Sequence, residues 1–363
     1  MAKTVMTVVG IRPDMIRMSE IFRKLDADPE IDHVLVHTGQ HFDHNLSDVF
    51  FDELNIREPD FNLACGAAGK PHYRVAGEVT NALLDDIIGR QKIKPDIILF
   101  LGDSNSVVCS VALKKEGYKV GHIEAGMRSG DRRMLEEINR TVCDHCSDLL
   151  FVYHDDYARN LYREHIEDGV HVVGNTIVEV AHKYGDYLVQ TEKAGDFILL
   201  DIHRPENFMD CHRLHSIFEY ADSCSREYQL PVKFLRFNRT IEYLTKFRQM
   251  HLLDRVEITP LMSYMDFLEA QYNCMFMISD SGTAQEEPAM LNTPVVVPRD
   301  YTERPQSMDN NCSFLLHVTS GDSWTKSWDW LGKMFHRDIT MSTGWLGDGT
   351  TSQKIIDILK AEL

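Results

Sequence analysis

Long hydrophobic runs are missing from this sequence. The apolar stretch nearest the start, VMTVVG (5–10), is soon followed by Arg12 and Asp14, and it is too short for a signal peptide or a membrane span. No later run approaches the ~18 apolar residues that a spanning helix requires. We therefore expect a cytoplasmic protein without membrane insertion.

Positive charge is also scarce. The 363 residues include 38 lysines and arginines against 56 aspartates and glutamates, which gives a net charge of −18. Because polyanions repel so acidic a chain, nucleic acids and anionic membranes are poor candidates for partners. A small anion held by a local group of arginines stays compatible with this charge. The length and the 43% of hydrophobic residues indicate a globular protein with two domains.

Cysteines are few and scattered. The eight cysteines form no dense pattern, which excludes a small disulfide scaffold and favours reduced thiols. Cys143 and Cys146 have the spacing of half a zinc site, but no second pair follows, and the same spacing makes two residues neighbours on a helix. We predict no metal site and no cofactor.

Strand-like and helix-like segments alternate along the first half. Apolar runs, several of them ending in glycine, occupy 5–10, 33–39, 96–103, 119–126, 148–154 and 170–176. Helical patterns lie between them at 14–27, 45–54, 74–91, 104–116, 135–146 and 155–165. This alternation predicts a parallel sheet that helices cover on both faces.

A second series of the same kind follows. Strands are predicted at 197–204, 232–237, 256–261, 275–282 and 294–300, and helices at 212–229, 240–250 and 284–291. We therefore predict an α/β fold with two domains, 1–172 and 173–347. An amphipathic helix at about 348–363 either completes the second domain or returns to the first.

Charged residues follow the predicted strand ends of the first domain, where open parallel sheets bind ligands. Arg12 and Arg17 flank a predicted helix start, which favours anions, although charges at helix ends are also common on surfaces. Asp103 follows a buried strand, and its ordinary task there would be to cap the next helix.

The segment GHIEAGMRSGDRRMLEEINR (121–140) concentrates acids and arginines among glycines. Glu124 and Arg128 stand beside backbone that a ligand can approach closely. Glu136 and Arg140 lie one helical turn apart, which is also the spacing of an ordinary i,i+4 ion pair. We interpret the segment as acid–base groups and cations placed beside a ligand.

The second domain offers a histidine and a phosphate loop. His203 and Arg204 end a predicted strand, and a histidine there suits acid–base chemistry or phosphate binding. Ser281 and Gly282 precede a helix start, which favours a phosphate, although helix capping is the alternative. Arg304 lies in a loop after the last strand. These residues predict a nucleotide diphosphate ligand in a cleft between the domains, neutralised by arginines.

The chain resembles the non-hydrolysing UDP-N-acetylglucosamine 2-epimerases. The matching strings run in the family's order from about residue 5 to residue 305: GIRPDMIRMS, HTGQHFD, LGDSNS, GHIEAGMRSGD, EEINR, VVGNTIVE, DIHRPENF, SDSGTAQEEP and RDYTERP. The resemblance implies two Rossmann-like domains with parallel sheets facing a central cleft, as in GT-B glycosyltransferases. It also implies a C-terminal helix that packs on the first domain, a homodimer, and a UDP-sugar substrate.

The resemblance further implies the chemistry and the residues that perform it. Family members interconvert UDP-GlcNAc and UDP-ManNAc by anti elimination of UDP, through a 2-acetamidoglucal intermediate. The catalytic group would comprise Asp103, Glu124, Glu136, His203 and Arg140. The substrate-binding group would comprise Arg12, Arg17, Arg128, Arg204, Ser281, Gly282, Thr283, Glu287 and Arg304, with Glu287 on the uridine ribose.

The sequence departs from the family pattern at several of these places. Arg17 replaces the usual lysine, Pro205 the second arginine of the histidine motif, and Thr283 the second glycine of the phosphate loop. Gln40 and His41 match part of a regulatory site known in bacterial members. An epimerase of a modified UDP-amino sugar, a hydrolysing epimerase, a glycosyltransferase and a nucleotide-sugar sensor are the alternative functions.

Overall fold

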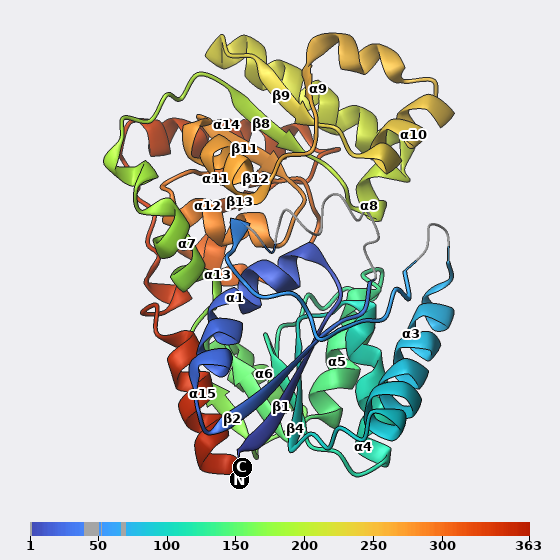
Figure 1. Cartoon of the computed structure of the whole chain (residues 1–363). Coiled ribbons are helices and arrows are strands. Elements are labelled where there is room, and N and C mark those ends of the chain that lie inside the picture. The colour runs from blue at the N-terminus through green and yellow to red at the C-terminus, as the bar shows by residue number, and fades with distance from the viewer. Residues whose placement is uncertain (1, 40–50, 52, 67–69) are drawn as a thin grey trace. The chain divides into compact units, whose positions relative to one another are not determined.

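The computed structural model describes residues 2–39, 51, 53–66 and 70–363 (Figure 1). The chain divides into two compact units: Met1–Val180 together with Leu346–Leu363, and Ala181–Trp345. The domain boundary predicted after residue 172 stays a prediction; the first unit extends to Val180. Gln40 and His41, and most of the helix predicted at 45–54, lie outside the described residues.

The first unit is built on a seven-stranded sheet in the order β3-β2-β1-β4-β5-β6-β7, in which every neighbouring pair is parallel. Its strands are β1 Lys3–Val9, β2 Ile31–His37, β3 Phe61–Asn62, β4 Ile97–Leu101, β5 Val120–Ile123, β6 Leu149–Val152 and β7 Val170–Val172. Its helices are α1 Arg12–Ala27, α3 His72–Asn81, α4 Ser110–Lys115, α5 Glu136–Cys146, α6 Asp155–Arg163 and α15 Thr351–Glu362. The helix α7, Ile177–Gly185, spans the boundary between the units.

Burial on both faces explains the apolar strands of this sheet. All five residues of β4 are buried, as expected for a central parallel strand. One face packs in a single cluster that includes Met6 and Ile98 of the sheet, Val79 of α3 and Leu113 of α4. The helix α1 contacts β1 and β2.

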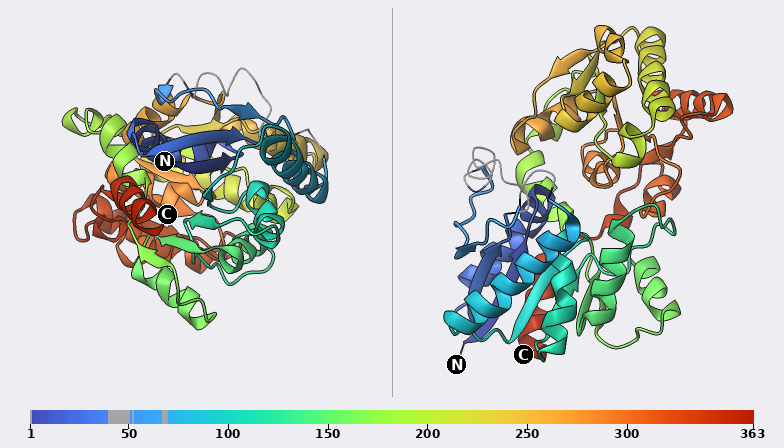
Figure 2. Two further views of the ribbon diagram at one scale, coloured as in Figure 1. Left: turned by 60° about the horizontal axis from the view of Figure 1, so that its bottom comes forward. Right: turned by 90° about the vertical axis from the view of Figure 1, so that its right-hand side faces the viewer.

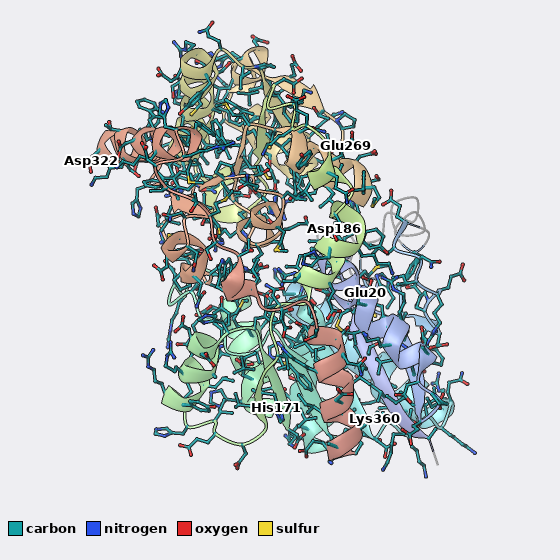
Figure 3. All side chains as sticks on the ribbon, turned by 90° about the vertical axis from the view of Figure 1, so that its left-hand side faces the viewer. Glu20, His171, Asp186, Glu269, Asp322 and Lys360 are labelled. Atoms are coloured by element: carbon teal, nitrogen blue, oxygen red, sulfur yellow. The ribbon has the colours of Figure 1, made fainter. Side chains whose placement is uncertain are left out.

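The C-terminal helix belongs to the first unit, although it is the last element of the chain. It lies beside α1 (Figures 1 and 2). Its Ile355 and Leu359 are fully buried, and Lys360, labelled in Figure 3, pairs with Asp28 at 3.0 Å. The chain therefore closes the first unit only after it has built the second.

The second unit repeats the design with a six-stranded parallel sheet in the order β10-β9-β8-β11-β12-β13. Its strands are β8 Ile198–Asp201, β9 Val232–Leu235, β10 Glu257–Thr259, β11 Phe276–Ser279, β12 Val295–Val297 and β13 Ser313–Leu315. Its helices are α8 Pro205–Phe208, α9 Cys211–Tyr228, α10 Asn238–Lys246, α11 Tyr264–Asn273, α12 Glu287–Met290, α13 Pro305–Asp309 and α14 Gly321–Phe335.

Side chains of β8 alternate between two cores. Ile198 and Leu200 join a cluster with Phe218 of α9 and Leu331 of α14. Leu199 joins the cluster on the opposite face of the sheet, with Met277 of β11. This arrangement is the two-faced burial that the apolar strand runs predicted.

The predicted fold class is confirmed, with differences at the edges. Both sheets are doubly wound. In each sheet the strand order reverses next to the strand that comes first in the chain, which is β1 in the first unit and β8 in the second. The edge strands β3 and β13 were missed. The helix predicted at 74–91 changes after Asn81 into a wider π-helical turn, Ala82–Arg90. No helix of the described residues combines the length and apolar character needed to cross a bilayer.

Candidate active site

The reversal of strand order marks the place where a ligand of each unit is expected, at the carboxyl ends of the strands. In the first unit these ends belong to β1, β4 and β5, and they carry Gly10, Asp103 and Glu124. In the second unit they belong to β8 and β11, and they carry His203 and Ser281. The fold thus brings the predicted residues of each unit to one edge of its sheet.

Glu124 follows β5 in a strained backbone conformation. Its φ is +71°, a left-handed value that costs free energy for a residue with a Cβ atom. Its side chain is buried and forms an ion pair with the buried guanidinium of Arg17 on α1. The predicted acid and the predicted cation therefore lie together, and the strain fixes the direction of the carboxylate.

Asp103 and Arg140 form the second ion pair of this edge. The pair joins the end of β4 to the middle of α5, and Arg140 is 3% exposed. Asn139 also donates its amide to the Asp103 carbonyl at 2.9 Å. The simple alternative for Arg140, an ion pair with Glu136 one turn away, is wrong, because Arg140 pairs with Asp103 and with Glu137.

The start of α5 separates the roles of its two glutamates. The Glu137 carboxylate accepts the amides of Ser129 and Gly130 at 3.0 Å, and it thereby ties the preceding loop to the helix. Glu136 is the first residue of α5 and is half-buried. Among the described residues, the hydrogen bonds to this loop go to the Glu137 carboxylate and not to that of Glu136.

The two other predicted arginines of this unit lie in different surroundings. Arg12 opens α1 and is half-buried; burial lowers its pKa, and the Glu53 carboxylate opposes that change. Arg128 forms two hydrogen bonds of 2.8 Å with Glu164 and one of 2.7 Å with Asp144. Arg128 is thus committed to protein carboxylates, which favours a positioning role over the predicted substrate contact.

Asp14 was missed by the sequence analysis. Its carboxylate accepts the amides of Gly10 and Ile11 at 3.1 and 3.3 Å, at the point where β1 turns into α1. Burial raises its pKa to about 7, against the effect of these hydrogen bonds. An aspartate in the first turn of a helix that follows a strand end was the available signal.

His203 in the second unit stands between two carboxylates. Its Nδ1 lies 2.8 Å from Asp201 Oδ1 and 3.5 Å from Asp280 Oδ1. Burial opposes the charge on the ring, but Asp201 and Asp280 raise the pKa of His203 to about 9. The imidazole is therefore an imidazolium at neutral pH, suited to donate a proton or to attract an anion.

Asp201, His203 and Asp280 also have the spacing to hold a metal ion, and they are the group of this kind that the described part of the chain contains. Asp280 accepts the amides of His203 and Arg204 at 3.0 Å, and Asp201 accepts the Ser279 hydroxyl at 2.8 Å. The carboxylates are thus used to fold the loop after β8. These hydrogen bonds favour a role of the carboxylates in holding His203 as an acid.

The predicted phosphate loop lies over a buried ion cluster. A Cβ atom on Gly282 would lie 2.6 Å from Arg304 Nη1 and 2.7 Å from Glu303 Oε1. Arg304 itself pairs with Glu303, and with Glu286 at 2.7 Å. Glycine is required here by close packing, since its φ of −63° suits any residue. Ser281 and Thr283 exchange a hydrogen bond of 3.0 Å beside it.

Glu287 is held by two residues that the sequence analysis did not single out. The Tyr264 hydroxyl donates to its Oε1 at 2.6 Å, and the Gln271 amide donates to its Oε2 at 2.7 Å. All three side chains are buried. Two buried donors therefore fix the orientation of the carboxylate, a group that accepts hydrogen bonds from hydroxyls.

Known proteins of the same kind cover nearly the whole chain. Residues 23–360 match the family model described as UDP-N-acetylglucosamine 2-epimerase. A UDP-N-acetylglucosamine 2-epimerase of Methanococcus maripaludis is 33% identical, with 98% of each chain covered. A UDP-2,3-diacetamido-2,3-dideoxy-D-glucuronate 2-epimerase of Pseudomonas aeruginosa is 30% identical, covering 98% of this chain and 99% of that one.

Solved structures agree with these matches. The crystal structure of the Methanocaldococcus jannaschii UDP-GlcNAc 2-epimerase in complex with UDP-GlcNAc and UDP is similar with a TM-score of 0.88, at 30% identity and 99% coverage of both chains. A glycosyltransferase, Phytolacca americana UGT2, shares the fold alone, with a TM-score of 0.55 at 11% identity. The chain belongs to the UDP-N-acetylglucosamine 2-epimerase family.

Proposed function

We propose that the protein is a non-hydrolysing 2-epimerase that interconverts UDP-GlcNAc and UDP-ManNAc. The observation that carries the proposal is the pair of carboxylates, Asp103 and Glu124, at the ends of two neighbouring strands, each with a buried arginine as its partner. An epimerase that exchanges a proton on two faces of a sugar needs more than one acid–base group, and it needs cations for the departing diphosphate.

The reaction consists of an elimination and its reversal. A carboxylate removes the proton from sugar carbon 2, the electron pair forms the double bond between carbons 1 and 2, and UDP leaves with the electrons of its bond to carbon 1. UDP then adds back to carbon 1 while a proton returns to carbon 2 on the opposite face. The two half-reactions balance, so neither water nor an oxidant is consumed.

We assign proton transfer to Asp103, Glu124 and Glu136. Arg17 and Arg140 place a positive charge directly beside the carboxylates of Glu124 and Asp103. His203, as an imidazolium, would donate to the diphosphate oxygen as it leaves, because a protonated ring can give a proton but cannot accept one.

The second unit would hold the nucleotide. Glu287, fixed by Tyr264 and Gln271, would accept hydrogen bonds from the ribose hydroxyls. Ser281, Gly282 and Thr283 would meet the diphosphate through backbone amides at the start of a helical turn, Thr283–Gln285. Arg12 and Arg204 complete the proposed ligand set. We also expect a homodimer, which light scattering of the purified protein tests.

A second candidate substrate is a UDP-linked diacetamido uronate. The relative of Pseudomonas aeruginosa that carries this name is 30% identical over 98% of the chain, close to the 33% of the UDP-GlcNAc relative. A uronate adds a carboxylate to the sugar, so an additional cation beside the sugar would distinguish the two substrates.

Proton NMR of the enzyme with UDP-GlcNAc in deuterated water tests the proposal. We expect UDP-ManNAc to form with deuterium at carbon 2. Free ManNAc together with UDP would instead establish a hydrolysing enzyme. If the enzyme converts the UDP-linked diacetamido uronate but does not convert UDP-GlcNAc, the second candidate substrate would be established.

A further inference from the structure

A buried histidine lies behind the two carboxylates of the first unit. His122 is on β5, two residues before Glu124, and it has no exposed surface. Its Nδ1 is 2.6 Å from Asp144 Oδ1, and its Nε2 is 2.7 Å from the carbonyl oxygen of Gly102. Each ring nitrogen therefore faces an oxygen that accepts hydrogen bonds.

Asp144 is held as a carboxylate. Its Oδ2 accepts the amide of Gly126 at 3.1 Å and the guanidinium of Arg128 at 2.7 Å. Burial opposes the charge of Asp144, but His122 and Arg128 keep its pKa below the usual range. A carboxylate and a carbonyl can only accept hydrogen bonds, so both ring nitrogens of His122 must carry a proton.

The backbone groups that this network holds lie beside the candidate acids. Gly102 immediately precedes Asp103, and Gly126 is two residues after Glu124. Gly102, Glu124 and Gly126 have φ values of +70°, +71° and +76°. The two glycines adopt such angles freely, but Glu124 carries a Cβ atom, and a left-handed residue of that kind persists only where its surroundings hold it. The hydrogen bonds to the Gly102 carbonyl and the Gly126 amide hold the backbone on the two neighbouring loops.

We propose that His122 is a permanently protonated positioning residue, which holds the Asp103 and Glu124 loops through Gly102 and, by way of Asp144, through Gly126. This inference rests on the proposed function, because it assigns the two carboxylates to proton transfer. His122 touches no substrate in this role. It acts by keeping two loops from different strands in register.

The groups around His122 agree with this charge. Besides Asp144, the cysteine of the same helix, Cys143, faces the ring, and the two raise the pKa of His122 well above its ordinary value despite burial. Arg128 and Glu164 continue the alternation of charge outward from Asp144. A core histidine that only fills space has no need of acceptors at both nitrogens.

The protonation state can be measured without any substrate. In the protein labelled with ¹⁵N-histidine, both ring nitrogens of His122 should carry a proton throughout pH 6 to 9. Substitution His122→Gln identifies its signals, and the exposed His165 provides a solvent-accessible ring for comparison in the same sample. A His122 ring with one unprotonated nitrogen at pH 7 would overturn the proposal.

The positioning role is tested with His122→Gln, because the glutamine amide has a single nitrogen and presents an oxygen to the second acceptor. We expect kcat to fall about 10- to 100-fold, the usual effect of removing a supporting hydrogen bond. KM and the affinity for UDP should stay within about twofold, since the proposed ribose contact Glu287 and the phosphate loop 281–283 lie in the second unit, and the described hydrogen bonds of this network do not include Arg12. His165→Gln is the matched control.

A folded His122→Gln variant with unchanged kcat would overturn the inference. A loss of UDP affinity as large as the loss of kcat would also overturn it, because it would indicate general structural damage. If this variant does not fold, Asp144→Asn replaces it. This substitution removes the carboxylate charge beside His122, so the His122 ring should lose one proton and kcat should fall by a similar factor. If the wild-type protein epimerises no UDP-sugar, the proposed function fails, while the NMR measurement still decides the state of His122.

Discussion

Arg17 on α1 and Glu124 at the end of β5 form an ion pair whose side chains are only 3% and 7% exposed. The two residues are 107 positions apart in the chain. Two charges this deeply buried stabilise each other, and removal of one breaks the ion pair. The pair thus couples the stability of the first unit to the proposed chemistry.

Replacement of Arg17 by methionine should therefore destabilise the protein by about 3–5 kcal/mol, the usual cost of breaking a buried ion pair. The double variant Arg17→Met with Glu124→Gln should lose less than the sum of the single losses, because the two side chains interact directly and each single loss includes the same broken pair. Urea unfolding of the three variants measures this. Additive losses would show that the two side chains do not interact.

Glu124→Gln keeps the size of the side chain but removes a carboxylate that we propose for proton transfer. We expect turnover to fall ~10²–10⁴-fold, the range for an acid–base group, while UDP affinity is retained. The exposed residue Glu116 at the end of α4 supplies the control, Glu116→Gln. Turnover of Glu124→Gln near that of the wild type would remove Glu124 from the mechanism.

Asp201→Asn should lower the pKa of His203, because it removes the nearer of the two carboxylates. The folded pKa of about 9 lies above the unfolded value near 6.5, so this protonation stabilises the fold below pH ~6.5 and the benefit is lost as pH rises toward 9. NMR titration of the ring in both proteins measures the change. An identical midpoint in the two proteins would contradict the role of Asp201.

Glu287→Ala should weaken the binding of free UDP about tenfold or more, because a buried charge-assisted hydrogen bond contributes roughly 1.5–3 kcal/mol. Calorimetric titration with UDP measures this effect. Glu227→Ala, at an exposed position of α9 in the same unit, is the control. Unchanged affinity for Glu287→Ala would contradict the proposed ribose contact.

Gly282→Ala should destabilise the second unit by about 1–3 kcal/mol, since the new methyl group would meet Arg304 and Glu303 at less than 3 Å. Gly321→Ala provides a control at a glycine whose Cβ position is open. Thermal unfolding with and without UDP compares the two variants. Equal melting temperatures would show that the loop shifts without cost.

The strand ends could be predicted because their signals are local. Apolar runs that end in charged or polar residues led to Asp103, Glu124 and His203, all of which follow a strand in the structure. The strands themselves end earlier than predicted, at Leu101 and Ile123, because Gly102 and Glu124 have left-handed backbone angles. A strand pattern carries no information on such angles.

Partners distant in the chain could not be predicted in the same way. Asp144 lies 22 residues after His122, and Tyr264 lies 23 residues before Glu287. Asp144 and Tyr264 each lie on a helix, where nothing local points to a distant partner. The missed strands β3 and β13 are short segments of two and three residues at the edges of the sheets. Packing decides these features, and only the folded chain contains it.

The return of α15 to the first unit has a consequence for synthesis of the chain. A ribosome makes proteins from the N-terminus, and domains usually fold in that order as they emerge. Here the surface of α1 that α15 contacts must wait for that helix, after the whole of Ala181–Trp345 has been made. The earlier unit can therefore complete its packing only after all of the later unit has been synthesised.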